Sequence, residues 1–400
     1  MPKYQTAGFY GLFLLILLVA CSDKEENFQV IKQNEGTTMQ SSLSEQDFSN
    51  LSDRFVDWVE ERQEEDNIPG VAIALVSSQE EEIVLTQGFG HRDLENQLPV
   101  TPETLFHIGS THKSMTALLI ATLVDEGILD WDTPAIGIEP EFELADADAT
   151  ENVTLRHLLS MRSGIPDQAE DEFDIDNSEA EDIFDYLAEV ELLGEPGEVF
   201  SYSNLTIALG GYLAVLAVDE QEEDLYKGYG ELLQERVLEP IGMKSSTLLA
   251  SEAKRNPHYS RSYIVEDGEL VEAETEDFDG DPLAPSGSLK ASIKDMASYI
   301  STQLNKGIAP NGERVVSEEN LLQTQIPKWG NYAMGWQTDT YQGITLISHE
   351  GSYDNFLSII GIIPEYNLGF VVLTNSEEAA LDLFEETPGK LIALMLGVRC

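Results

Sequence analysis

The sequence predicts an α+β fold in which an antiparallel sheet is built from N- and C-terminal segments, is flanked by helices, and carries a largely helical inserted subdomain. Short β-rich runs of apolar residues gather near both ends of the chain, whereas helical spacing of apolar residues dominates the middle. The chain has 400 residues, of which 42% are hydrophobic, so it can form two to three domains or subdomains with ample core. We expect the α/β part at about 48–125 and 286–400, and the helical insertion at about 126–285.

The N-terminal elements follow from the period of the apolar residues. Residues 48–65 have helical spacing, and the Asn-Ile-Pro-Gly sequence at 67–70 ends that helix. Two β-rich runs, 71–76 and 83–89, are separated by polar residues and predict a hairpin. A core helix is expected to begin near Ser110, because its apolar residues recur three, four, seven and eight positions apart.

The middle of the chain is acid-rich and helical. Residues 139–185 are irregular apart from a short helical pattern at 155–161. Helices are expected over 205–218, 226–238 and 293–304. The tail returns to strands, expected at 334–338, 345–348, 357–363 and 369–374, and a final helix is expected at 379–396.

The N-terminus has the features of an export segment. Lys3 precedes an apolar run over 9–20, which is shorter than the roughly 20 residues of a membrane span. We therefore expect a signal peptide at 1–20 and, from its polar composition, a flexible tether at 21–47. The Leu-Val-Ala-Cys sequence that ends at Cys21 resembles the lipobox of bacterial lipoproteins, and the serine after it resembles the outer-membrane pattern. That resemblance implies a lipid-anchored protein of the bacterial cell envelope; an ordinary signal peptide with a chance cysteine is the alternative.

The charge of the chain excludes several kinds of partner. Asp and Glu number 74 against 22 Lys and Arg, which gives a net charge of −52. Nucleic-acid binding needs clustered cations, so we expect no nucleic-acid partner, and the lipid anchor is the only membrane contact expected. A hydrated acidic surface also suggests a saline habitat, because salt screens self-repulsion. The two cysteines, at 21 and 400, form no disulfide framework. The six histidines show no metal-binding spacing, so neither metal nor cofactor is expected.

A Ser-x-x-Lys motif begins the helix expected near residue 110. Positions i and i+3 face the same side of a helix, so the amine of Lys113 can reach the hydroxyl of Ser110. A free lysine with a pKa of about 10.4 is a poor base at neutral pH, but burial can lower that pKa. The helix N-terminus favours a developing oxyanion. Alternatively, Ser110 is only an N-cap and Lys113 a solvated side chain.

Two further motifs can contribute polar groups to the same pocket. A Tyr-x-Asn motif places the phenol of Tyr202 and the amide of Asn204 at a loop-to-helix transition. A His-Glu-Gly-Ser sequence at 349–352, expected at the end of a strand, can present backbone N–H groups to an oxyanion. Taken singly, each of these motifs is also explained by a structural role.

In this order, the three motifs resemble those of the serine β-lactamase and penicillin-binding-protein superfamily. The chain is most similar to the class C β-lactamase-related branch, which includes D-Ala-D-Ala carboxypeptidases, D-aminopeptidases and family VIII esterases. The similarity spans about residues 50–376 and includes further short matches, namely 153–166, 240–243, 286–289, 334–336 and 373–375. It implies a β-lactamase/transpeptidase-like fold over 48–400.

The resemblance also implies a role for each motif. Ser110 would be the acylated nucleophile, Lys113 its proton partner and Tyr202 a proton relay, with either Lys113 or Tyr202 as the acylation base. Asn204 would contact substrate. The site residues expected from the third motif are His349, Gly351 and Ser352, and the backbone N–H groups of Ser110 and Ser352 would form the oxyanion hole.

One position departs from the β-lactamases. His349 stands where they carry the lysine of a Lys-Thr-Gly motif, and Glu350 beside it adds negative charge. Both changes disfavour anionic β-lactams. We therefore expect a serine hydrolase acting through an acyl-enzyme on a small-molecule or peptide ester or amide. The alternatives are a β-lactam hydrolase and a non-catalytic binding or regulatory protein with this fold.

Calcium binding by the acidic loop at 171–177 is a further alternative, although the loop lacks the glycine of an EF-hand.

Overall fold

A computed structural model describes residues 43–78 and 83–397. Within these residues the main sheet is antiparallel and has seven strands in the order β3-β2-β1-β11-β10-β9-β8. Its strands are β1 (Gly70–Ser77), β2 (Ile83–Asp93), β3 (Leu98–Pro99), β8 (Gln337–Tyr341), β9 (Ile344–Tyr353), β10 (Phe356–Ile363) and β11 (Leu368–Thr374). The central pair joins the two ends of the chain, since Val71 of β1 pairs with Thr374 of β11. This confirms the predicted α+β fold.

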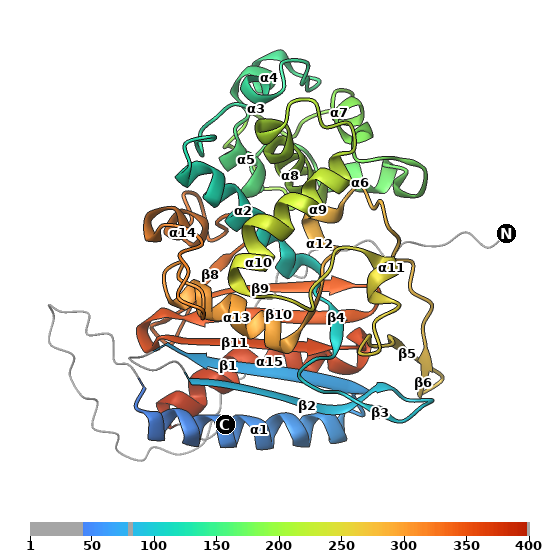
Figure 1. The fold of residues 1–400 in the computed structure, drawn as a ribbon, viewed down its shortest axis with the longest axis vertical. Helices are drawn as coiled ribbons and strands as arrows, with labels where there is room; N and C mark the ends of the chain where they lie inside the picture. The colour runs from blue at the N-terminus through green and yellow to red at the C-terminus, as the bar shows by residue number, and fades with distance from the viewer. Residues whose placement is uncertain (1–42, 79–82, 398–400) are drawn as a thin grey trace, which may run out of the picture.

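Alternation along β1 divides the core between the two faces of the sheet. Val71, Ile73 and Leu75 pack with the terminal helices, whereas Ala72 and Ala74 belong to the larger core on the opposite face. Every residue of β1 is buried, because both faces of the sheet are covered. The covering helices are α1 (Glu45–Glu65) and α15 (Glu377–Leu396) on one face and α13 (Ile293–Leu304) on the other (Figure 1).

The middle of the chain forms a helical region above the β8–β9 edge of the sheet (Figure 1). It is organised around α2 (Lys113–Asp125) and α8 (Asn204–Val218), which pack against each other and are buried on nearly all sides. The other helices of this region are α3 (Ala135–Ile138), α4 (Ala147–Asn152), α5 (Leu155–Leu159), α6 (Ala169–Glu172), η2 (Ile175–Asn177), α7 (Asp182–Leu187), α9 (Leu225–Leu233), η3 (Gln234–Leu238), α10 (Glu239–Ile241), α11 (Ala250–Ala253), α12 (Ala284–Gly287) and α14 (Glu318–Gln325).

Several local features differ from the sequence predictions. Ser110 lies in a 3-10 turn, η1 (Gly109–His112), that precedes α2. The strand predicted at 345–348 continues through Tyr353, so His349–Ser352 lie inside β9 and not at its end. The strand predicted at 334–338 begins only at Gln337. Gly335 has a φ of +75°, which is not an extended conformation, so the strand cannot include it. Two short strand pairs had no clear sequence pattern: β4 (Leu105–His107) with β7 (Lys290–Ser292), and β5 (Tyr263–Glu266) with β6 (Glu269–Glu272). The turn η4 (Pro364–Tyr366) lies in the segment 364–368, which was predicted to join the last two strands as a hairpin.

The export segment lies outside the described residues. The predicted signal peptide over 1–20, Cys21 and most of the tether are therefore not part of the described structure, and lipid anchoring stays a prediction. Within residues 43–78 and 83–397, no helix combines the length and the apolar character needed to cross a bilayer.

Candidate active site

The Ser-x-x-Lys motif occupies the junction between the sheet and the helical region. Gly109 has a φ of +48°, and the chain then turns through η1 into α2. This places Ser110 at a partly exposed position, whereas Lys113 is fully buried one turn later. The Lys113 Nζ donates to Ser110 Oγ over 2.8 Å. A partly exposed hydroxyl therefore contacts an amine that is shielded from water.

Lys113 makes two more hydrogen bonds. Its Nζ donates to the backbone carbonyl of Ser286 in α12 at 2.9 Å and to Asn204 Oδ1 at 2.5 Å. Burial lowers the pKa of Lys113 to about 7, although the negative charge of Glu170 opposes this effect. At neutral pH, a substantial fraction of Lys113 is therefore the free amine that a general base requires.

The Tyr-x-Asn motif brings a phenol to the same serine. Tyr202 precedes α8 and forms a side-chain hydrogen bond with Ser110, and the Lys113 Nζ lies 5.0 Å from the centre of its ring. Burial raises the pKa of Tyr202 well above its ordinary value, and the Ser110 hydrogen bond offsets only part of this. The phenol therefore stays protonated at neutral pH and is suited to donate a proton.

Glu170 is part of this site, although the sequence analysis did not select it. It lies on α6, where its carboxylate accepts from the backbone N–H of Asn204 and, at 2.9 Å, from Asn204 Nδ2. Burial raises the pKa of Glu170, and its bonds from Asn204 and the nearby Lys113 act in the opposite direction. Both ends of the Asn204 amide are therefore engaged within the protein.

Two glycines bring the β9 backbone against the serine turn. A Cβ on Gly351 would lie 2.7 Å from the Ser110 nitrogen, and one on Gly109 would lie 2.7 Å from the Ser352 nitrogen. Ser358 of β10 and Thr111 both donate to the Ile108 carbonyl, at 2.5 and 2.8 Å, which fixes the turn to the sheet. The backbone nitrogens of Ser110 and Ser352 thus lie close together, which suits an oxyanion hole.

His349 is buried on the same strand. Burial, followed by the charge of Lys113, lowers the pKa of His349 to about 3, so the ring is neutral. Its Nδ1 lies 2.6 Å from the Glu350 carbonyl, which can only accept, so Nδ1 carries the proton. The hydroxyl of Tyr332 therefore donates to His349 Nε2 at 2.9 Å. Both ring nitrogens are occupied, and neither offers a charge to a substrate carboxylate.

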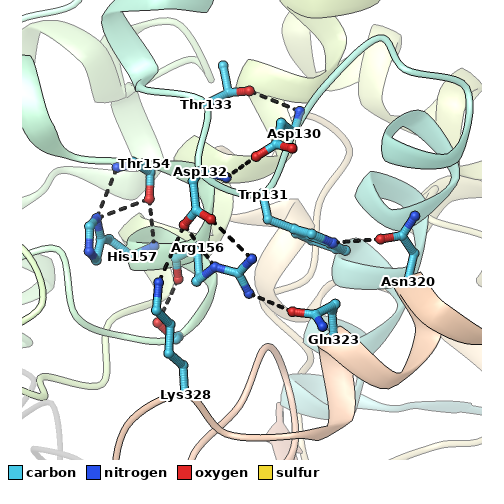
Figure 2. A network of polar contacts seen from close by, with 11 residues as sticks. Asp130, Trp131, Asp132, Thr133, Thr154, Arg156, His157, Asn320, Gln323 and Lys328 are labelled. Atoms are coloured by element: carbon cyan, nitrogen blue, oxygen red, sulfur yellow. Dashed lines mark hydrogen bonds and ion pairs between the residues drawn. The ribbon is translucent and has the colours of Figure 1, made fainter.

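A polar network links α5 and α14 to residues 130–133 and to Lys328 (Figure 2). Arg156 of α5 bonds to Asp132 at 2.9 Å and to Gln323 of α14 at 3.1 Å. Lys328 pairs with Asp132 at 3.6 Å, and Trp329 stacks on His157 with ring centroids 5.3 Å apart. Arg156 and His157 belong to the segment at 153–166 that the resemblance singled out, so that segment contacts both α14 and Trp329.

The structure therefore brings together Ser110, Lys113, Tyr202, Asn204, His349, Gly351 and Ser352, all chosen from the sequence. It adds Glu170 and Tyr332. Glu170 is one of many carboxylates in an acid-rich stretch, and nothing in the sequence distinguishes it from its neighbours. Tyr332 lies shortly before the Met-Gly-Trp sequence at 334–336, and that proximity was the only available signal.

Comparison with known proteins agrees with this geometry. The beta-lactamase family model matches residues 55–394. Protein flp of Staphylococcus aureus strain MW2 is 30% identical over 77% of this chain and 60% of its own length. The unguisins hydrolase ungD' of Aspergillus campestris is 28% identical over 82% of this chain and 61% of its own length. The chain thus spans about three fifths of the curated relatives it matches.

Two solved structures share the fold. A penicillin-binding protein homologue from Pyrococcus abyssi, described as octameric, is 28% identical and has a TM-score of 0.69 over 87% of this chain and 78% of that one. A crystal structure described as SurE has a TM-score of 0.73 over 88% of this chain and 78% of that one, but at 20% identity it supports the fold alone. From the family match and the relatives, the chain belongs to the beta-lactamase family of serine hydrolases.

Proposed function

We propose that this protein hydrolyses an ester or an amide through a covalent acyl-enzyme on Ser110. The hydrogen bond from a buried lysine to a partly exposed serine carries the proposal, because it joins a nucleophile to a base that is partly deprotonated at neutral pH. The relatives support it, since one of them is described as an unguisins hydrolase.

In the proposed acylation step, Lys113 accepts the Ser110 proton while Oγ attacks the substrate carbonyl carbon. The oxyanion is stabilised by the backbone N–H groups of Ser110 and Ser352. Tyr202 donates its proton to the leaving group as the carbonyl–leaving-group bond breaks, and the proton that Lys113 took from Ser110 then neutralises the phenolate. Water then attacks the acyl-enzyme, with the same groups acting in reverse order.

The geometry favours uncharged or cationic acyl donors over β-lactams. In the β-lactamases that the chain resembles, a lysine at the position of His349 helps to hold the substrate carboxylate, whereas the His349 ring is neutral and hydrogen-bonded at both nitrogens. The net charge of −52 adds long-range repulsion of anions. We therefore propose an esterase, D-aminopeptidase or D-Ala-D-Ala carboxypeptidase type of activity in the class C-related branch, ahead of antibiotic hydrolysis. Of these, neutral esters and the cationic substrates of a D-aminopeptidase fit the neutral His349 best, because a D-Ala-D-Ala peptide carries a carboxylate of its own.

The central test replaces the nucleophile. Ser110→Ala is expected to reduce hydrolysis of a p-nitrophenyl ester to the background rate and to abolish labelling by a fluorophosphonate. Ser114→Ala, a buried serine one turn along α2, serves as a control for changes in packing. Undiminished turnover by Ser110→Ala would disprove the assignment, and an unlabelled native protein would favour the non-catalytic alternative. A panel of short-chain esters, D-Ala-D-Ala peptides and nitrocefin would then identify the substrate class.

A further inference from the structure

A carboxylate lies behind the catalytic lysine and reaches it through a single amide. Glu170 accepts from the Asn204 backbone N–H and from Asn204 Nδ2, and Asn204 Oδ1 accepts from Lys113 Nζ at 2.5 Å. A further hydrogen bond reaches Glu170 from the backbone N–H of Leu205. No side chain of Ser203, the N-cap residue, caps α8, so Glu170 satisfies donors at this helix N-terminus from outside.

This arrangement allows only one orientation of the Asn204 amide. An ionised carboxylate accepts hydrogen bonds and donates none, so Glu170 must face the NH2 group of Asn204. The amide oxygen is then directed at Lys113. If the amide rotated by half a turn, its oxygen would face the carboxylate and its NH2 group would face the ammonium, and both contacts would be repulsive.

The charge of Glu170 also acts on Lys113 directly. Burial favours the neutral amine of Lys113, whereas the negative charge of Glu170 favours the ammonium. The protonation of Lys113 at neutral pH is thus a balance between these two effects. Glu170 touches neither Ser110 nor the reacting atoms in any contact described above.

We propose that Glu170 is a positioning residue that fixes the Asn204 amide toward Lys113 and, through its charge, sets the pH range in which Lys113 accepts the Ser110 proton. This inference rests on the proposed function and goes beyond it, because it assigns a role to a residue outside the three motifs.

The other titratable groups around Lys113 are not a substitute for Glu170. His112 and His349 are both buried, and the charge of Lys113 lowers the pKa of each, so both are neutral. Tyr202 stays protonated. Of the helices packed on α2, α12 contributes a backbone carbonyl and α9 contributes Tyr229, which bonds to His112. The carboxylates of α14, Glu318 and Glu319, are exposed at its first turn. Glu170 is therefore the charge that offsets the burial of Lys113.

The test follows the pH dependence of Ser110 acylation by a fluorophosphonate, measured between pH 5 and 10 for the full chain. Replacing Glu170 by glutamine (Glu170→Gln) removes the charge and leaves a side chain with a single acceptor oxygen. We expect the acid limb of the rate profile to move to lower pH by about one unit, because Lys113 loses its counter-charge. We also expect the plateau rate to fall about tenfold, because the amide is no longer fixed.

Two further variants separate charge from packing. Glu172→Gln removes the same charge from the same short helix, but at an exposed position, and is expected to leave the limb and the plateau unchanged. Glu170→Asp keeps the charge on a shorter side chain. This variant is expected to lower the plateau rate of Ser110 labelling, while the acid limb of the pH profile stays near that of the native protein. It also provides the test of positioning if Glu170→Gln does not fold.

The outcomes distinguish the two proposals. A loss of the α8 cap alone would lower the melting temperature of Glu170→Gln without moving the limb. Coincident limbs for the native protein, Glu170→Gln and Glu172→Gln would overturn the role of Glu170. A native plateau in Glu170→Asp would overturn the positioning of Asn204. If the native protein is not labelled at any pH, the proposed function itself fails.

Discussion

At the scale of single residues, the site depends on two groups whose proton affinities differ from those in water. Burial lowers the pKa of Lys113 to about 7 and raises that of Tyr202. Lys113 therefore becomes a base, and Tyr202 remains an acid, at the same pH. The choice between them as acylation base was open from the sequence, because burial cannot be read from a motif. Both groups contact Ser110, and we propose Lys113 as the base because burial lowers its pKa and raises that of Tyr202.

We predict that kcat/KM for a neutral ester increases as the pH rises through about 7. We expect no decrease in kcat/KM at higher pH, up to pH 10. Lys113 must be neutral to accept the serine proton, and its neutral fraction increases as the pH passes its pKa. Tyr202, whose pKa is raised, keeps its proton throughout this range. Initial rates corrected for spontaneous hydrolysis give the profile. A rate that decreases between pH 6 and 8 would contradict Lys113 as the base.

The residues that the sequence revealed are those whose spacing carries chemistry. Ser110 and Lys113 are three positions apart, so helix geometry alone predicts their contact. Tyr202 and Asn204 stand out as a short motif at a loop-to-helix transition. Glu170 acts on Asn204 across 34 positions, and it stands among similar carboxylates that are exposed to solvent. Only the three-dimensional fold distinguishes it from them.

At the scale of elements, a buried ion pair fastens the strands that lead into the serine turn. Lys290 of β7 faces His107 of β4 in the strand register and pairs with Asp277 at 2.8 Å, with both charged side chains fully buried. His107 also stacks on Tyr353, with ring centroids 4.9 Å apart, directly after Ser352. The ion pair is therefore linked through His107 both to the strand that precedes the serine turn and to the end of β9.

We predict that Lys290→Met lowers the free energy of unfolding by about 3–5 kcal/mol, because Asp277 is left buried without its partner. Burial already raises the pKa of Asp277 to about 6, against the opposing charge of Lys290. A carboxyl with a raised folded pKa loses stability as the pH increases through that value, and removing Lys290 extends the loss to higher pH. Denaturant unfolding should therefore show a larger deficit at pH 8 than at pH 5.

The control for this prediction is Lys294→Met, four residues later on α13 and exposed. It is expected to change the unfolding free energy by less than about 0.5 kcal/mol. Equal effects of the two substitutions would contradict a stabilising role for the buried pair.

Helices and strands were predicted correctly from the sequence where a periodic pattern of apolar residues continued over many positions. Strands β1, β2, β8, β10 and β11 and helices α8 and α13 were predicted within a few residues of their bounds, whereas the two-residue strand β3 was not predicted. The end of β9 was missed because Glu350 and Gly351 break the apolar pattern, although backbone pairing to β10 continues through Tyr353. The pairing of β4 and β7 was missed because each strand has three residues, which is too short for a period.

At the scale of the whole molecule, the excess of acidic residues sets the response to solution conditions. The net charge is −52, because carboxylates greatly outnumber Lys and Arg. The ion pairs of the described residues therefore neutralise only some of the carboxylates. Mutual repulsion of the remaining carboxylates opposes the compact state.

We predict that monovalent salt raises the melting temperature at pH 7 by several degrees between about 0.05 and 1 M, because the Debye length falls from above 10 Å to about 3 Å. Scanning calorimetry in sodium chloride measures this, and a potassium chloride series controls for effects of a particular cation. A melting temperature independent of ionic strength would remove the basis for expecting a saline habitat.

The contacts of the serine turn with β9 and β10 have a consequence for when the proposed site can form during synthesis. The serine turn is fastened to the sheet by the bond between Ser358 and Ile108, which are 250 positions apart. A nascent chain that ends before β9 carries Ser110, Lys113 and Tyr202 but lacks the Ser352 amide and the strand that fixes the turn. Long-range pairing of this kind forms late in folding. Until β9 and β10 have been made, the chain therefore lacks both the contact that holds the serine turn on the sheet and the second proposed oxyanion donor.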